Sequence, residues 1–103
     1  MALKTSNATE FTSDISSGIV LVDFYRNDCT PCKMLAPLVD DIVADYPNLS
    51  VIKLNLTEHE SVGEIYGFRA APVLALFEDG ELVNGLMGYQ PYEAILEFIK
   101  PYL

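Results

Sequence analysis

Two patterns of hydrophobic residues alternate along this chain: nearly continuous apolar runs, and hydrophobic residues at helical spacing. The nearly continuous apolar runs at 19–25 (IVLVDFY) and 71–77 (APVLALF) are typical of strands covered on both faces. Residues 49–56 are apolar at most positions and predict a third interior strand. The Asp79-Gly80 pair predicts a tight turn that joins 71–77 to a strand over 82–87 as an antiparallel hairpin.

Other segments carry hydrophobic residues at helical spacing. The longest follows the segment CTPC and has an acidic opposite side, an internal proline at Pro37 that should kink it, and Pro47 after its end. Asn7 with Glu10, and Thr57 with Glu60, have the spacing of helix-capping pairs. The helical faces are Phe11 and Ile15; Leu35, Leu38, Val39, Ile42 and Tyr46; Val62, Ile65 and Tyr66; and Tyr92, Ile95, Leu96 and Ile99.

The order of these elements indicates the fold class. A weak strand near Leu3 is followed by alternating helices and strands, then by the hairpin and a last helix. This order predicts an α/β protein with a central mixed β-sheet flanked by helices on both faces. With 103 residues, we expect one domain over 1–103.

Charge and composition exclude several classes of function. The chain has 15 acidic and 6 basic residues and a net charge of -9, which disfavours binding to nucleic acid. The N-terminal residues lack the apolar stretch of a signal peptide, and no apolar run reaches the length of a membrane span. We therefore expect a cytoplasmic monomer that binds neither nucleic acid nor membrane.

The only two cysteines, Cys29 and Cys32, are three positions apart. A structural disulfide at this spacing closes too small a loop to constrain the unfolded chain much. A zinc site within one chain would need further ligands, and His59 is the only histidine. A zinc site shared between chains stays possible on this argument, as does a reactive pair.

The reactive interpretation has a physical basis. Pro31 suits the first position of a helix, so both sulfurs would lie at a helix N-terminus. The unpaired N–H groups and the positive end of the dipole there stabilise a thiolate, which is the nucleophilic form. A second sulfur three residues on can resolve a mixed disulfide.

The whole chain resembles thioredoxins, from about Phe11 to its end. The segments VLVDFY, CTPCKMLAPLVDDI, VIKLNL, YGFRAAPVLALFEDGE and MGY occur in the order and spacing of that family. The resemblance implies the thioredoxin fold and dithiol–disulfide exchange without a bound cofactor. It also implies roles for Cys29 as attacking thiol, Cys32 as resolving thiol and Asp23 as a buried carboxylate behind them.

Further residues match positions of the family's site. Lys53 corresponds to the lysine near the buried carboxylate, and Pro72 to a cis-proline that faces the disulfide. The resemblance implies a surface for substrates formed by Tyr25, Asp28, Thr30, Pro31, Ala71, Pro72 and Gly88. The residues support Asp23 independently, because a carboxylate within an apolar strand has a raised pKa and can accept a proton near neutral pH.

Several positions depart from the family pattern. Asp28 and Thr30 flank Cys29 where tryptophan and glycine are usual; Tyr25 replaces a second tryptophan, and Val73 a common threonine. A negative charge about 6 Å from Cys29 in water would oppose thiolate formation by roughly 0.7 kcal/mol. Arg26 and Lys33 are the candidates to offset it.

We therefore expect a protein-disulfide reductase whose partners are disulfide-containing proteins and an external thioredoxin reductase. An oxidant or isomerase would use the same chemistry, because the residues between the cysteines tune the potential. A non-catalytic binding module is the alternative from another class. Retention of both cysteines with Asp23 argues against it, and the loss of both tryptophans argues mildly for it.

Overall fold

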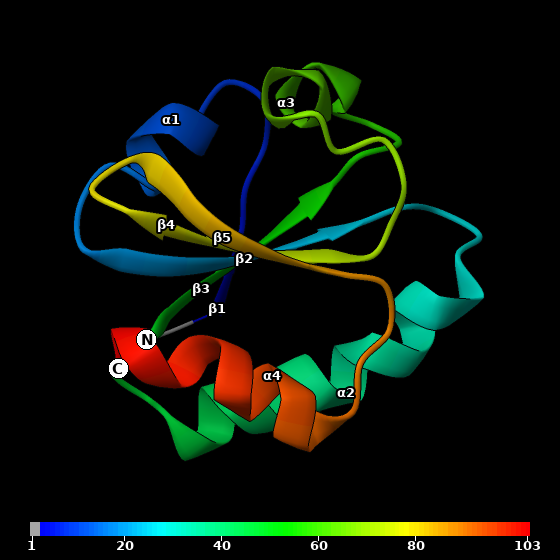
Figure 1. Ribbon diagram of the computed structural model, residues 1–103. Coiled ribbons are helices and arrows are strands. Elements are labelled where there is room, and N and C mark those ends of the chain that lie inside the picture. Colours follow the sequence, from blue (N-terminus) through cyan, green and yellow to red (C-terminus); the bar gives the residue numbers. More distant parts are fainter. Residues whose placement is uncertain (1–2) are drawn as a thin grey trace.

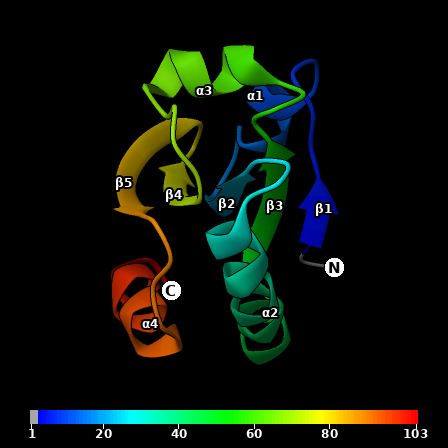
Figure 2. The same cartoon turned by 90° about the vertical axis from the view of Figure 1, so that its right-hand side faces the viewer.

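A computed structural model describes residues 3–103. One five-stranded sheet runs through its centre in the order β1-β3-β2-β4-β5, which Figure 2 shows from the side. β2 pairs in parallel with β3 and antiparallel with β4, so the sheet is mixed, as predicted. The strands are β1 Leu3–Thr5, β2 Ile19–Tyr25, β3 Ser50–Asn55, β4 Val73–Glu78 and β5 Glu81–Met87.

Helices cover both faces of the sheet, which also confirms the prediction. Figure 1 shows α1 and α3 on one face and α2 and α4 on the other. No helix within 3–103 has the length and apolar character needed to cross a membrane. The helices are α1 Phe11–Asp14, α2 Thr30–Asp45, α3 Glu60–Tyr66 and α4 Tyr92–Ile99, and a short 3₁₀ helix follows at Lys100–Tyr102.

The central strand β2 separates two hydrophobic cores. Because side chains of a strand alternate between faces, Val22 and Phe24 enter the core below α1 and α3, whereas Leu21 enters the core below α2 and α4. The first core is rich in aromatic rings, which include Phe11, Phe24, Tyr66, Phe68 and Phe77. The second core is mainly aliphatic and includes Leu21, Leu35, Val39, Leu74, Ile95 and Ile99.

Asp23 lies on the same face of β2 as Leu21, and this placement creates the candidate site. Leu35 of α2 packs in the core with Leu21, so α2 lies across this face of the sheet. The N-terminal turn of α2 therefore reaches the end of β2, where Asp23 is located. Pro37 lies inside α2 as predicted, and the helix continues through it to Asp45.

The start of α3 differs from the sequence-based expectation. The predicted capping pair of Thr57 and Glu60 is wrong, because α3 begins only at Glu60 and His59 occupies its N-cap position. The Thr57 hydroxyl instead accepts a hydrogen bond of 3.0 Å from the backbone N–H of Asn27. A tertiary contact thus uses the oxygen that a local cap would need.

The two other helical details are partly as expected. The Asn7 side chain accepts a 2.8 Å bond from the backbone N–H of Glu10, as a cap would, although the regular helix starts later, at Phe11. Ile65 belongs to α3 but is 73% exposed, so it does not share the buried position of Val62. Helical periodicity alone made it part of the apolar face.

Candidate active site

Cys29 and Cys32 form a disulfide at the start of α2. The helix begins at Thr30, one residue earlier than the position of Pro31 suggested, and Cys29 is its N-cap. The Cys29 sulfur accepts a 3.3 Å hydrogen bond from the backbone N–H of Cys32. A sulfur therefore takes the place that a hydroxyl or carboxylate oxygen usually takes at a helix start.

The two sulfurs differ in their access to solvent. Cys32 is 7% exposed, inside the first turn of α2, whereas Cys29 is only partly buried. The Cys29 Sγ lies 3.9 Å from the backbone carbonyl oxygen of Ala71. A reagent approaching from solvent thus reaches Cys29 more easily than Cys32.

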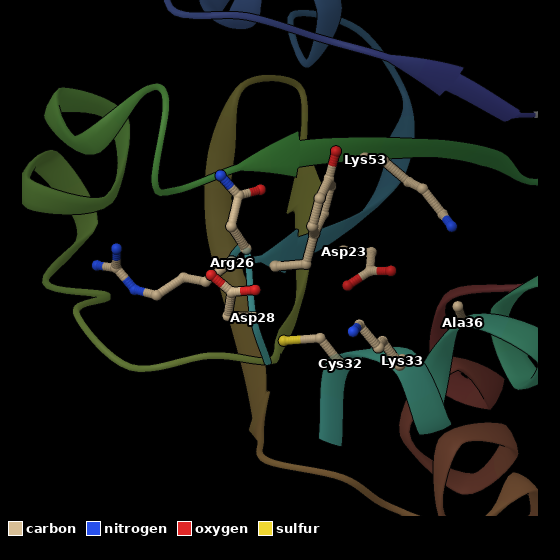
Figure 3. Close-up of a pocket in the computed structure, with 9 residues that line it drawn as sticks. Asp23, Arg26, Asp28, Cys32, Lys33, Ala36 and Lys53 are labelled. Carbon is tan, nitrogen blue, oxygen red and sulfur yellow. The ribbon is translucent and has the colours of Figure 1, made fainter. Parts of the chain in front are cut away.

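A pocket of about 640 Å³ lies beside the disulfide, on the side of Cys32. Asp23 from β2, Lys53 from β3 and Cys32 from α2 contribute to its wall (Figure 3). Four residues that the sequence named for the site therefore come together with Cys32 here: Asp23, Tyr25, Asp28 and Lys53. The remaining lining residues are Arg26, Asn27, Lys33 and Ala36.

Asp23 is a buried carboxylate with an unpaired oxygen. Its side chain is 3% exposed, and its Oδ1 has no hydrogen-bond partner within residues 3–103. Burial raises the pKa of Asp23 to about 6, the charge of Lys53 lowers it in part, and Asp40 raises it slightly. Lys53 is the β3 residue in register with Asp23, which explains its influence. The carboxylate therefore changes its charge close to neutral pH.

The Ala71–Pro72 segment approaches the disulfide at Cys29 and not at the pocket beside Cys32. The peptide bond between Ala71 and Pro72 is cis, and Pro72 is buried. The backbone N–H of Gly88 donates a 2.8 Å bond to the Pro72 carbonyl. Gly88 has a φ of 77°, a conformation that favours glycine. Thr30 and Pro31 are exposed at the helix start, on the same rim as Cys29.

Two polar connections at this end of the molecule were missed by sequence reasoning. The Arg26 guanidinium donates from Nε and Nη2 to the Arg69 carbonyl, at 3.0 and 2.8 Å. The Asn55 amide donates a 2.9 Å bond to the Asn27 side chain. For the second connection the signal available was that Asn27 follows β2 and Asn55 ends β3, because the carboxyl ends of neighbouring parallel strands meet at one edge of a sheet.

Asp28 stands immediately before the disulfide as an exposed negative charge. It has a φ of 53° and, among the residues that the structure describes, forms no ion pair with Arg26 or Lys33. Figure 3 shows the Arg26 side chain extending away from Asp23 and Lys33. The Arg69 carbonyl holds the Arg26 guanidinium, and an offset of the Asp28 charge by Arg26 or Lys33 stays a prediction.

Comparisons with known proteins show which family the chain belongs to. A sequence model of the thioredoxin family matches residues 2–101. The thioredoxins of Staphylococcus epidermidis and Staphylococcus aureus are each 36% identical to the chain over 104 aligned positions, which cover all of both proteins.

A solved structure gives the same result for the fold. A single-residue mutant of the thioredoxin from Halobacterium salinarum superimposes with a TM-score of 0.88 and 34% identity, over 98% of this chain and 90% of that one. The mixed sheet with helices on both faces is thus the thioredoxin fold. The close cysteine pair is consistent with thiol–disulfide oxidoreductase activity. The chain therefore belongs to the thioredoxin family.

Proposed function

We propose that the chain reduces protein disulfides through Cys29 as the attacking thiol and Cys32 as the resolving thiol. The observation that carries this assignment is the unequal access of the two sulfurs. Cys29 is at the rim, 3.9 Å from the Ala71 carbonyl, whereas Cys32 is 7% exposed inside the helix. A bulky protein disulfide can meet the first sulfur but not the second.

The reaction balances without a bound cofactor. The Cys29 thiolate attacks one sulfur of the substrate disulfide, and the other substrate sulfur leaves as a thiolate and takes up a proton. Cys32 then loses its proton and attacks the Cys29 sulfur of the mixed disulfide. The substrate leaves as a dithiol, and the Cys29–Cys32 disulfide present in this structure is formed.

Asp23 is the proposed acceptor of the Cys32 proton. Both side chains line the same pocket, and a pKa of about 6 is near the pH at which the proton must move. The pocket is wide enough for water to bridge the two groups. We propose that Lys53 tunes this carboxylate, since its charge lowers the pKa that burial raises.

The Ala71–Pro72 segment is the proposed docking point for the substrate backbone. The N–H of Ala71 has no hydrogen-bond partner in the described part of the chain, so an extended peptide can pair with it. The Gly88 N–H holds this segment in place through its 2.8 Å bond to the Pro72 carbonyl. Tyr25, Asp28, Thr30 and Pro31 are the proposed remainder of this surface.

The oxidised pair must be reduced again before another turnover. We propose that a thioredoxin reductase supplies the electrons and that disulfide-containing proteins are the substrates, as membership of the family implies. The cytoplasmic location that the sequence suggested stays a prediction.

Reduction of insulin tests the proposed function. With dithiothreitol as electron source, the protein should accelerate insulin precipitation well above the rate with dithiothreitol alone, because its thiolate is stabilised at a helix start. A double mutant with serine at both cysteines is the control. Activity equal to dithiothreitol alone would favour a binding module.

A redox titration of the cysteine pair distinguishes a reductant from an oxidant. A low midpoint potential would identify a reductant, and a high one an oxidant.

Single cysteine variants test the two thiol roles. Cys32→Ser should accumulate mixed disulfides with substrate proteins, because nothing resolves them. Cys29→Ser should accumulate few, because Cys32 is buried. Non-reducing gels after incubation with an oxidised protein measure the trapped species. Trapping by Cys29→Ser alone would reverse the assignment.

Asp23→Asn tests the buried carboxylate. Its pKa is raised from 3.8 to about 6, so the folded protein holds more protons than the unfolded chain between these values, and stability falls as pH rises through them. Above this pH window, wild type has lost about 3 kcal/mol of its free energy of unfolding through this titration, and below about pH 4 it has lost none. Asparagine does not titrate, so the variant lacks this loss. The free energy of unfolding of the variant minus that of wild type should therefore be larger at neutral pH than at about pH 4.

Urea unfolding of the oxidised proteins across this range measures the difference. Asp41→Asn, which removes an exposed carboxylate of α2, is the matched control and should follow the wild-type profile. An Asp23→Asn profile parallel to that of wild type would contradict the raised pKa.

Asp28→Asn tests the charge beside Cys29. Asparagine keeps the shape and accepts a φ of 53°, whereas a bulky tryptophan would be strained there. The variant should increase the alkylation rate of Cys29 by about threefold at neutral pH and low salt, since roughly 0.7 kcal/mol of repulsion is removed. High salt should reduce this difference. Iodoacetamide rates in a Cys32→Ser background provide the measurement, and equal rates at low salt would exclude the electrostatic effect.

A further inference from the structure

The Arg26 side chain bridges the two backbone segments on either side of the disulfide. It starts from the segment that leads from β2 to Cys29 and ends at the Arg69 carbonyl, in the segment before β4. Two guanidinium N–H groups converge on this single carbonyl, at 3.0 and 2.8 Å. A forked, charged donor is stronger and more directional than a neutral one.

The segment that carries Arg26 is itself held from the opposite side. The backbone N–H of Asn27 donates to the Thr57 hydroxyl at 3.0 Å, and the Asn55 amide donates to the Asn27 side chain at 2.9 Å. Asn55 is 7% exposed and also accepts a 2.9 Å bond from the Thr57 N–H. Arg26 therefore extends from a base that is fixed to the end of β3.

The segment before β4, to which Arg26 donates its hydrogen bonds, is anchored at a second point near the disulfide. The Gly88 N–H holds the Pro72 carbonyl at 2.8 Å, and Arg26 holds the Arg69 carbonyl three residues earlier. Ala71 lies between these two anchors, with its carbonyl 3.9 Å from the Cys29 Sγ. Without Arg26, the stretch from Arg69 to Ala71 would, within residues 3–103, be held only at its two flanks, by Gly88 at Pro72 and by the Phe68 N–H, which donates a 2.8 Å bond to the Gly63 carbonyl.

We propose that Arg26 is a positioning residue that fixes Ala71 relative to Cys29, so that a docked peptide presents its disulfide to the attacking sulfur. The proposal rests on the proposed function, because it concerns substrate docking at that site. Arg26 acts through the backbone that its guanidinium holds, at the Arg69 carbonyl. A misplaced docking segment slows exchange with a peptide but not attack on a small reagent, which needs no docking.

Arg69 offers a matched control for charge. It is an exposed arginine at the same end of the molecule, and it takes part in the bridge only through its backbone carbonyl. Arg69→Ala therefore removes the same charge as Arg26→Ala and leaves the acceptor in place. Arg26→Lys keeps the charge and one donor group but loses the fork.

The test compares two rates in these variants. The first is the reduction of a disulfide-linked peptide by the reduced protein in a single turnover, and the second is alkylation of Cys29 by iodoacetamide in a Cys32→Ser background. Arg26→Ala should slow peptide reduction by roughly fivefold and leave alkylation within about twofold of wild type. Arg69→Ala should leave both rates within about twofold, and Arg26→Lys should be intermediate.

Three results would overturn the proposal. Equal slowing by Arg26→Ala and Arg69→Ala would show an effect of charge. Equal slowing of both rates in Arg26→Ala would show a general disturbance of the site. Unchanged peptide reduction in Arg26→Ala would show that the bridge does not position the substrate.

A measurement without activity separates this proposal from the proposed function. Backbone order parameters of the Ala70 and Ala71 amides should fall in Arg26→Ala and stay unchanged in Arg69→Ala. If wild-type protein fails to reduce insulin, the proposed function fails, and the order parameters still decide whether Arg26 fixes the segment. If wild type is active and neither rates nor order parameters respond to Arg26→Ala, only the positioning role fails.

Discussion

The burial of β2 on both faces is the constraint on which the rest of this structure depends. The strand pairs with β3 and β4, and a helical layer covers each of its faces. A polar side chain within such a strand has no route to bulk solvent except at the strand end. Asp23 lies near that end, where the pocket beside Cys32 opens. The burial that forms the core therefore also raises the pKa of Asp23, so that this carboxylate changes its charge near neutral pH.

A buried carboxylate with an unpaired oxygen is unfavourable for stability. Its position beside a helix-start cysteine pair fits a balance between stability and function, in which the unfavourable group performs the proposed proton transfer. Lys53 reduces the penalty only in part, because within residues 3–103 it is a strand neighbour of Asp23 that forms no ion pair with it. A stronger pairing would lower the pKa of Asp23 and remove the acceptor from the useful range.

The segment between β2 and the disulfide is organised by hydrogen bonds in this chain. Arg26 and Asn27 tie it to the Arg69 carbonyl, to the Thr57 hydroxyl and to the Asn55 side chain. A forked, charge-assisted hydrogen bond such as that of Arg26 adds geometric specificity as well as energy. A substrate meets a rim that carries the exposed negative charge of Asp28, on a protein whose net charge is already -9.

The sequence by itself determined the order of strands and helices, the mixed sheet and the position of the cysteine pair at a helix start. It did so because continuous apolar runs, helical spacing and the proline and glycine signals are local properties. Resemblance to a family added residues around the pair, such as Lys53 and Pro72, whereas the apolar strand around Asp23 indicated that carboxylate independently. Tertiary structure alone decided that the Thr57 hydroxyl binds the Asn27 N–H instead of capping α3, and that the Arg26 guanidinium donates to the Arg69 carbonyl. Each of these outcomes depends on which distant backbone group comes within hydrogen-bond distance, and that is set by the packing of strands and loops far apart in the chain.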